Sequence, residues 1–163
     1  MRRALATACL LLALPALAGD RSHVPVRIGD IFGYETWSGR PVLPPRYDRA
    51  TPFRDGRAAA LRGEAWGILD ETGRWIVPPR FTWIHPARFD EGPALVSANG
   101  LYGYVDREGE LVVPLALGEA TPFDEGRACV RHAAGGDWAL IDTAGRILGT
   151  HRFQACEPDF HDD

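Results

Sequence analysis

The sequence has little that points to a membrane-spanning or nucleic-acid-binding protein. Beyond its first 18 residues it has no apolar run of the roughly 18 to 20 residues that a membrane span needs. It also has no surplus of positive charge: its 18 basic residues are all arginine, and 22 acidic residues outnumber them, for a formal net charge of −4. We therefore expect no nucleic-acid partner.

Motifs of catalysis and cofactor binding are missing as well. The chain has no Gly-x-Ser-x-Gly, no His-Glu-x-x-His and no phosphate-binding loop, the patterns that place a nucleophile, a metal or a phosphate at a fixed point of a fold. The five histidines lack the spacing of metal ligands: His23, His85, His132, His151 and His161. We expect no enzyme activity, no cofactor and no metal site, and an uncharacterised enzyme is only the third alternative.

Two acidic clusters raise the question of cation binding. The pairs Asp90-Glu91 and Asp124-Glu125 occupy equivalent positions of a repeat, which favours a solvated turn over a calcium site or a glycosidase pair. Residues 159–163 form an acidic tail, for which a solvated chain end is favoured over a weak cation site.

The first 18 residues have the pattern of a secretory signal peptide. Arg2 and Arg3 precede an apolar stretch over residues 4–14, and an Ala-x-Ala cleavage site follows at residues 16–18. We predict cleavage after Ala18, a periplasmic or secreted protein, and no stable membrane span after cleavage; an uncleaved anchor is the alternative. Loss of the two arginines changes the formal charge from −4 to −6.

One phrase recurs three times at intervals of 36 residues. It joins an aromatic residue, a small residue, two apolar residues and an aspartate, at Trp66–Asp70, Tyr102–Asp106 and Trp138–Asp142. A loop ending in glycine and an apolar run follow each copy. A period of 20 to 50 residues marks a repeat protein, whose units bury their apolar faces against one another. The chain therefore divides into a signal peptide (1–18), a β-repeat domain (19–158) and an acidic tail (159–163), with about three and a half repeats starting near residues 24, 58, 94 and 128.

The apolar runs predict strands. They are four or five residues long and lie between Gly, Pro and Asp, which is too short for helices. We predict an all-β protein whose tandem repeats each form a meander of three short antiparallel strands. Alternation along residues 66–70 places apolar side chains on both faces, so neighbouring units are expected to cover both. An open solenoid-like array and a propeller-like ring both remain possible.

Glycine, aspartate and proline have structural explanations within each unit. Gly67 and Gly103 leave room for a backbone or a ring, and Asp70 with Gly73 has the signature of a type I turn. We expect the second strand of each unit to end at its proline, such as Pro78, because proline cannot donate to the sheet. The strand around Pro25 is expected to be an edge strand.

These residues resemble the WG repeat family, whose units combine an aromatic-Gly-aromatic-aliphatic-Asp phrase, a Gly turn, a Val-Ile-Pro-Pro strand and a Phe-x-x-Gly segment. The resemblance covers about residues 32–153. It implies an exported bacterial protein with a β-rich tandem array used for interaction, without shared catalytic residues. Phe32 and Tyr102 depart from the signature Trp, and Ala139 departs from the signature Gly.

Binding specificity is expected where the copies differ. The segment over residues 78–89 is two residues longer than its counterparts and carries Trp83 and His85, which we identify as possible contacts for a peptide or a sugar ring. The alternative is that Trp83 packs onto Phe81 and Phe89.

The first repeat is rich in arginine, in contrast to the rest of the chain. Residues 19–62 hold eight arginines and five acids, and residues 63–163 hold eight arginines and 17 acids. Arg46, Arg49 and Arg54 are therefore possible contacts for an acidic partner, with an ordinary solvated face as the alternative.

Two cysteines follow the signal peptide, Cys129 and Cys156. Export to an oxidising compartment permits a disulfide between them. Because both also occupy ordinary apolar positions of the repeat, two free thiols are an equal alternative.

From these observations we expect a non-enzymatic exported repeat protein that provides a surface for protein–protein interaction in the bacterial cell envelope. The partner is an unknown protein or envelope component. The alternative is a structural module that binds carbohydrate or peptidoglycan through Trp83.

Overall fold

The computed structural model describes residues 23–85, 89, 91–149 and 156. This part of the chain is all-β, as predicted, and within it no helix has the length and apolar character to cross a membrane. The strands are β1 (His23–Ile28), β2 (Ile31–Thr36), β3 (Pro41–Tyr47), β4 (Arg49–Ala50), β5 (Arg57–Arg62), β6 (Ala65–Asp70), β7 (Trp75–Phe81), β8 (Trp83–Ile84), β9 (Ala94–Ala98), β10 (Leu101–Val105), β11 (Leu111–Ala120), β12 (Arg127–His132) and β13 (Ala139–Asp142).

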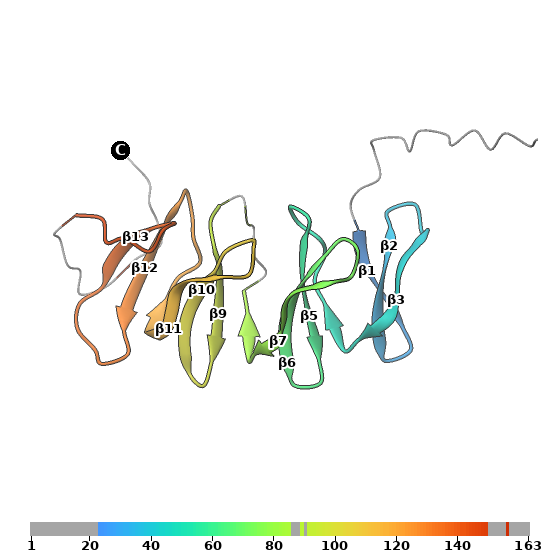
Figure 1. Cartoon of the computed structure of the whole chain (residues 1–163), viewed down its shortest axis with the longest axis horizontal. Helices are drawn as coiled ribbons and strands as arrows, with labels where there is room; N and C mark the ends of the chain where they lie inside the picture. Colours follow the sequence, from blue (N-terminus) through green and yellow to red (C-terminus); the bar gives the residue numbers. More distant parts are fainter. Residues whose placement is uncertain (1–22, 86–88, 90, 150–155, 157–163) are drawn as a thin grey trace, which may run out of the picture.

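The strands form antiparallel sheets that follow one another along the long axis of the molecule (Figure 1). The sheet orders are β1-β2-β3, β4-β5-β6-β7 and β13-β12-β11-β10-β9-β8. The sheets follow the order of the chain, and the β1-β2-β3 sheet lies at one end of the row while β12 and β13 lie at the other. The array is therefore open rather than a closed ring, and β1 with its Pro25 is an edge strand, as predicted.

The long strand of each unit connects it to the next unit. In β11, Val113 pairs with Tyr104 of β10, whereas Ala120 pairs with Val130 of β12. The strand pairs β3/β4 and β7/β8 do the same across a single intervening residue, since β7 pairs with β6 and β8 pairs with β9. Each third strand thus becomes the outer strand of the following meander.

Both faces of the central strands are buried, but against different neighbours. In β6, Leu69 belongs to a cluster with Tyr34 of the preceding unit, whereas Ile68 belongs to a cluster with Val96 of the following unit. Full burial of such a side chain contributes about 1.5–3 kcal/mol. A single unit without neighbours would leave both of these faces in water, so the units stabilise one another.

The predicted strand ends at the prolines are wrong, because β3, β7 and β11 continue through them. In the β6–β7 ladder, Trp66 pairs with Phe81 and Ile68 pairs with Val77, so residues 78–80 bulge opposite Gly67. A bulged residue needs no ladder hydrogen bond, and proline is therefore tolerated there.

The bulge presses against the glycine of the phrase. A Cβ atom on Gly67 would lie 2.5 Å from the Val77 carbonyl oxygen and 2.7 Å from the Trp75 ring, and one on Gly103 would lie 2.7 Å from the Val113 carbonyl oxygen. The expected close approach of a backbone and a ring is confirmed. Ala139 takes this position in the last unit, where Ile147 forms only an isolated bridge.

We predict that Gly67→Ala destabilises the protein by about 2 kcal/mol or more, because a backbone carbonyl cannot move aside as a flexible side chain can. Urea unfolding followed by tryptophan fluorescence measures this. Gly100→Ala is the control, since its φ of 76° carries a backbone cost of about 1 kcal/mol but its Cβ would meet nothing within 4 Å. Equal losses for the two variants would contradict the close-approach explanation.

The aspartate of the phrase organises the turn after it. The Asp70 Oδ1 atom accepts hydrogen bonds from the backbone N–H of Thr72 (2.9 Å) and of Arg74 (3.0 Å), and Gly73 has a φ of 80°. Burial raises the pKa of Asp70, but the hydrogen bonds from Thr72 and Arg74 outweigh it and hold that pKa below its usual value. Asp106 and Asp142 accept equivalent bonds.

We predict that Asp70→Asn lowers stability at neutral pH by about 1 kcal/mol or less, because the exposed charge is screened by solvent. A carboxyl whose pKa is lowered in the folded state stabilises that state above its unfolded pKa, and the contribution disappears as the pH falls through the lowered value. The difference between the two proteins should therefore vanish in acid, and urea titrations from pH 7 to pH 2 measure it. A difference that persisted unchanged at pH 2 would contradict this explanation.

Candidate functional site

Trp83 lies at the surface of β8. Its side chain is 40% exposed, whereas Phe81 is 1% exposed and belongs with Phe89 to the cluster between the second and third sheets. Packing of Trp83 onto Phe81 and Phe89 stays an alternative. The Trp83 ring meets the ring of His85 edge to face, with centroids 5.7 Å apart. Burial lowers the pKa of His85, and Glu91 acts in the opposite direction.

The three predicted arginine contacts do not converge on one site. The Arg46 guanidinium lies 5.8 Å from the centre of the neighbouring Tyr47 ring. Arg49 lines a hollow together with Arg27, whereas Arg54 lines a separate pocket. The spacing of these arginines in the sequence did not show that they lie at different places on the surface.

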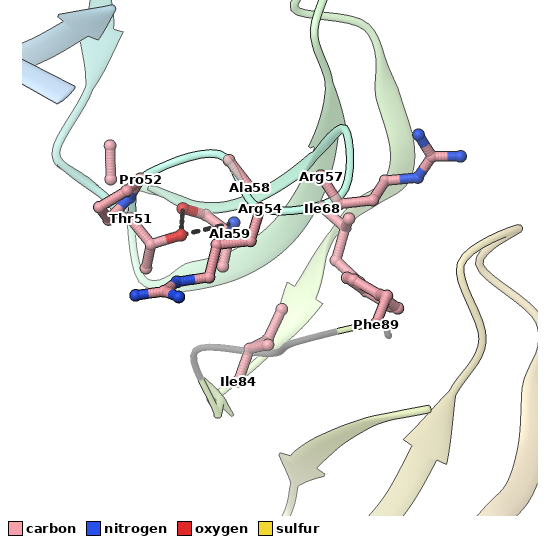
Figure 2. Close-up of a pocket in the computed structure, with 10 residues that line it drawn as sticks. Thr51, Pro52, Arg54, Arg57, Ala58, Ala59, Ile68, Ile84 and Phe89 are labelled. Atoms are coloured by element: carbon pink, nitrogen blue, oxygen red, sulfur yellow. Dashed lines mark hydrogen bonds between the residues drawn. The ribbon is translucent and has the colours of Figure 1, made fainter. Parts of the chain in front are cut away.

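Arg54 borders a pocket of about 240 Å³ between the second and third sheets (Figure 2). Its wall is mainly apolar, with Ala59, Ile68, Ile84 and Phe89 among the lining residues, and Arg57 is the second arginine beside it. Sequence reasoning missed this pocket, although one signal was present: the central residue of the third segment is Ala59 here, but Leu95 and Cys129 in the later copies.

The next hollow along the array is acidic. It is lined by Glu91, Asp106, Glu108, Asp124 and Glu125, together with Arg107 and several smaller residues. Glu125 and Gly126, with φ of 47° and 75°, form a two-residue turn between Asp124 and Arg127, whose backbones exchange hydrogen bonds. This hollow and the pocket beside Arg54 thus differ in the sign of their charge.

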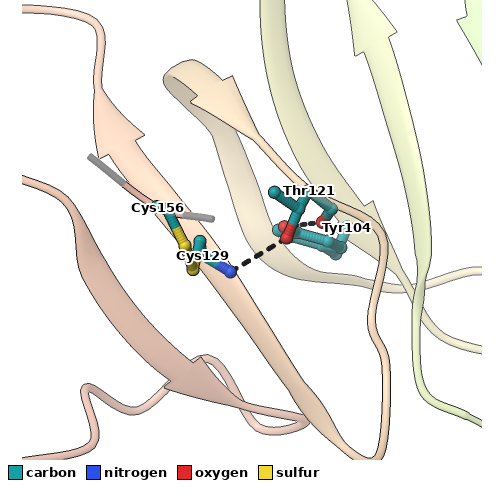
Figure 3. Close-up of a disulfide and its surroundings, with 4 residues drawn as sticks. All are labelled: Tyr104, Thr121, Cys129 and Cys156. Carbon is teal, nitrogen blue, oxygen red and sulfur yellow. Dashed lines mark hydrogen bonds between the residues drawn. A yellow bond between two sulfur atoms is a disulfide. The ribbon is translucent and has the colours of Figure 1, made fainter. Parts of the chain in front are cut away.

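A disulfide joins Cys129 to Cys156 at the end of the array (Figure 3). Their Cα atoms are 6.3 Å apart, and the Cys129 N–H donates to the Thr121 hydroxyl oxygen at 3.0 Å. The neighbours of Cys129 in β12, Ala128 and Val130, belong to the cluster shared with the preceding unit. Cys129 is on the opposite face, where another unit would otherwise pack, yet it is only 2% exposed.

The disulfide follows the spacing of the repeat. Ile84, Ala120 and Cys156 each stand 11 residues after the turn glycine of their unit. Ile84 belongs to the cluster that contains Ala59, and Ala120 packs against the cluster that contains Leu95. The bond between Cys156 and Cys129 is the covalent counterpart of these contacts between units.

We predict that the disulfide stabilises the last unit by about 3 kcal/mol, the chain-entropy value for a loop of this length. Mass mapping without reductant should find one peptide pair joined through Cys129 and Cys156. Reductant should lower the unfolding midpoint of the wild type but leave a Cys129→Ser, Cys156→Ser protein unchanged. Two free thiols in the oxidised protein would contradict the prediction.

Comparison with known families identifies the kind of repeat. Residues 38–64, 66–102 and 102–133 each match the WG containing repeat. Because the matches cover more than half of the chain, this protein belongs to the WG repeat family. No curated protein and no solved structure matches it.

Proposed function

We propose that this repeat protein is exported to the bacterial cell envelope and binds another protein there without catalysing a reaction. The observation that carries the proposal is the contrast between two hollows on the surface of the array. One is lined by Arg54 and Arg57, whereas the other is lined by several carboxylates. Repeat proteins commonly bind through the surface that runs along successive units.

The pattern of residues 1–18 supports export, and the differences between copies support recognition. The repeated Gly67 and Asp70 have roles in strand packing and in the turn. Arg54, which lines the basic pocket, varies between copies, because aspartate takes its place at residues 90 and 124. A partner that recognises this surface therefore reads the differences between units rather than the repeated phrase.

A second candidate is binding of carbohydrate or peptidoglycan. The specific observation in its favour is Trp83, whose ring is 40% exposed at the beginning of the longest inter-unit loop. Exposed aromatic rings provide large apolar contact areas with a polar edge.

Affinity capture from envelope extract distinguishes these candidates. The tagged protein should retain a reproducible protein partner, and insoluble peptidoglycan should not deplete it from solution. Trp83→Ala serves as the matched variant in both experiments. Depletion by peptidoglycan that is lost in Trp83→Ala would favour the second candidate, and capture of no reproducible protein would contradict the first.

A further inference from the structure

We propose that the pocket between the second and third sheets binds an acidic peptide segment through one apolar anchor residue. The inference rests on the proposed function and names the chemistry of the partner. Three features of the pocket support it: its apolar wall, its size and its arginines.

The pocket exists because one repeat position is small. Ala59 of β5 pairs with Ile68 of β6, as Leu95 pairs with Tyr104 and Cys129 pairs with Leu140 in later units. Leu95 is buried in the cluster of its groove, and Cys129 is covered through its disulfide. Only at Ala59 does the position carry a single methyl group. The space left there is about 240 Å³.

The size of the pocket suits one side chain. Sites for drug-sized ligands usually enclose about 300–1,000 Å³, so this pocket is smaller. Ile68, Ile84 and Phe89 supply apolar wall. A leucine, isoleucine or phenylalanine of a partner would lose contact with water there, and such anchors supply much of the binding energy at protein interfaces.

The charge around the pocket favours a carboxylate. The Arg54 guanidinium has no hydrogen-bond or ion-pair partner in the described part of the chain, and Figure 2 shows it on the opposite side of the apolar wall from Arg57. Arg57 is held by hydrogen bonds to the Arg107 and Gly56 carbonyl oxygens and lies near Asp70. Arg54 is therefore the less compensated positive charge, and arginine pairs with carboxylates through two parallel hydrogen bonds.

The corresponding residues of later units reverse this charge. Asp90 and Asp124 replace Arg54 in the Phe-x-x-Gly segment. The following groove also has five carboxylates among its lining residues. An acidic peptide is therefore attracted to the pocket beside Arg54 and repelled by the acidic hollow, which favours one position of binding along the array.

Selection from a phage library of random twelve-residue peptides on the immobilised full chain tests the proposal. The selected peptides should share one large apolar residue with aspartate or glutamate beside it. Binding of one selected peptide, labelled with fluorescein, is then measured by fluorescence anisotropy. Ala59→Leu fills the pocket with the residue found at Leu95, and Arg54→Asp introduces the charge found at Asp124.

Both variants should weaken peptide binding at least tenfold. Arg40→Asp, which makes the same charge change in the β2–β3 turn, should change it less than twofold. Circular dichroism melting checks the fold, and if Ala59→Leu fails to fold, Arg54→Ala and Arg54→Asp together decide. Absence of an acidic consensus, or binding within twofold of wild type for the folded pocket variants, would overturn the proposal. Capture of the same envelope partner by the pocket variants would overturn the pocket and leave the proposed function standing.

Discussion

The packing of each sheet against the next unit is the interaction on which the structure depends. Leu69 and Ile68 are adjacent in β6 yet contribute to two different clusters. A meander separated from its neighbours would expose both of these faces. Stability is therefore a property of the whole array. Each end unit has one face without a neighbouring unit, and this face must be covered in another way.

The two ends of the array differ in this respect. At the end near β13, the disulfide covers the outward face at Cys129. At the other end, Glu35 of β2 takes the position of the buried Leu69 of β6. The positions that distinguish the ends are those that contact a neighbour elsewhere in the array. Small substitutions there change which surfaces are available, and they leave the repeated phrase intact.

Local features of the fold could be predicted from the sequence. The Asp70 turn and the crowding at Gly67 depend on residues close in the chain, and the three-strand units follow from alternation over five residues. The bulge that lets β7 continue through Pro78 was missed, because it requires knowledge of which residue lies across the ladder. The separation of Arg49 and Arg54 into two hollows was missed for a related reason: it depends on where one sheet ends and the next begins.

Only part of the candidate site could be predicted from the sequence. Arg54 was identified from the charge of the first unit, but the pocket beside it requires Ile84 and Phe89 of the next unit. The contrast of Ala59 with Leu95 was visible in the sequence. The structure was needed to show that this position faces the following unit, so that a small residue there leaves a pocket.

Small-angle X-ray scattering of the chain from Gly19 to Asp163, which includes all strands described above, tests the open array most directly. A compact domain of this length has a radius of gyration of about 15 Å. An open row of sheets predicts a clearly larger radius of gyration and an asymmetric pair-distance distribution with a tail at long distances. A symmetric distribution with a radius of gyration near the compact value would contradict an open row of sheets.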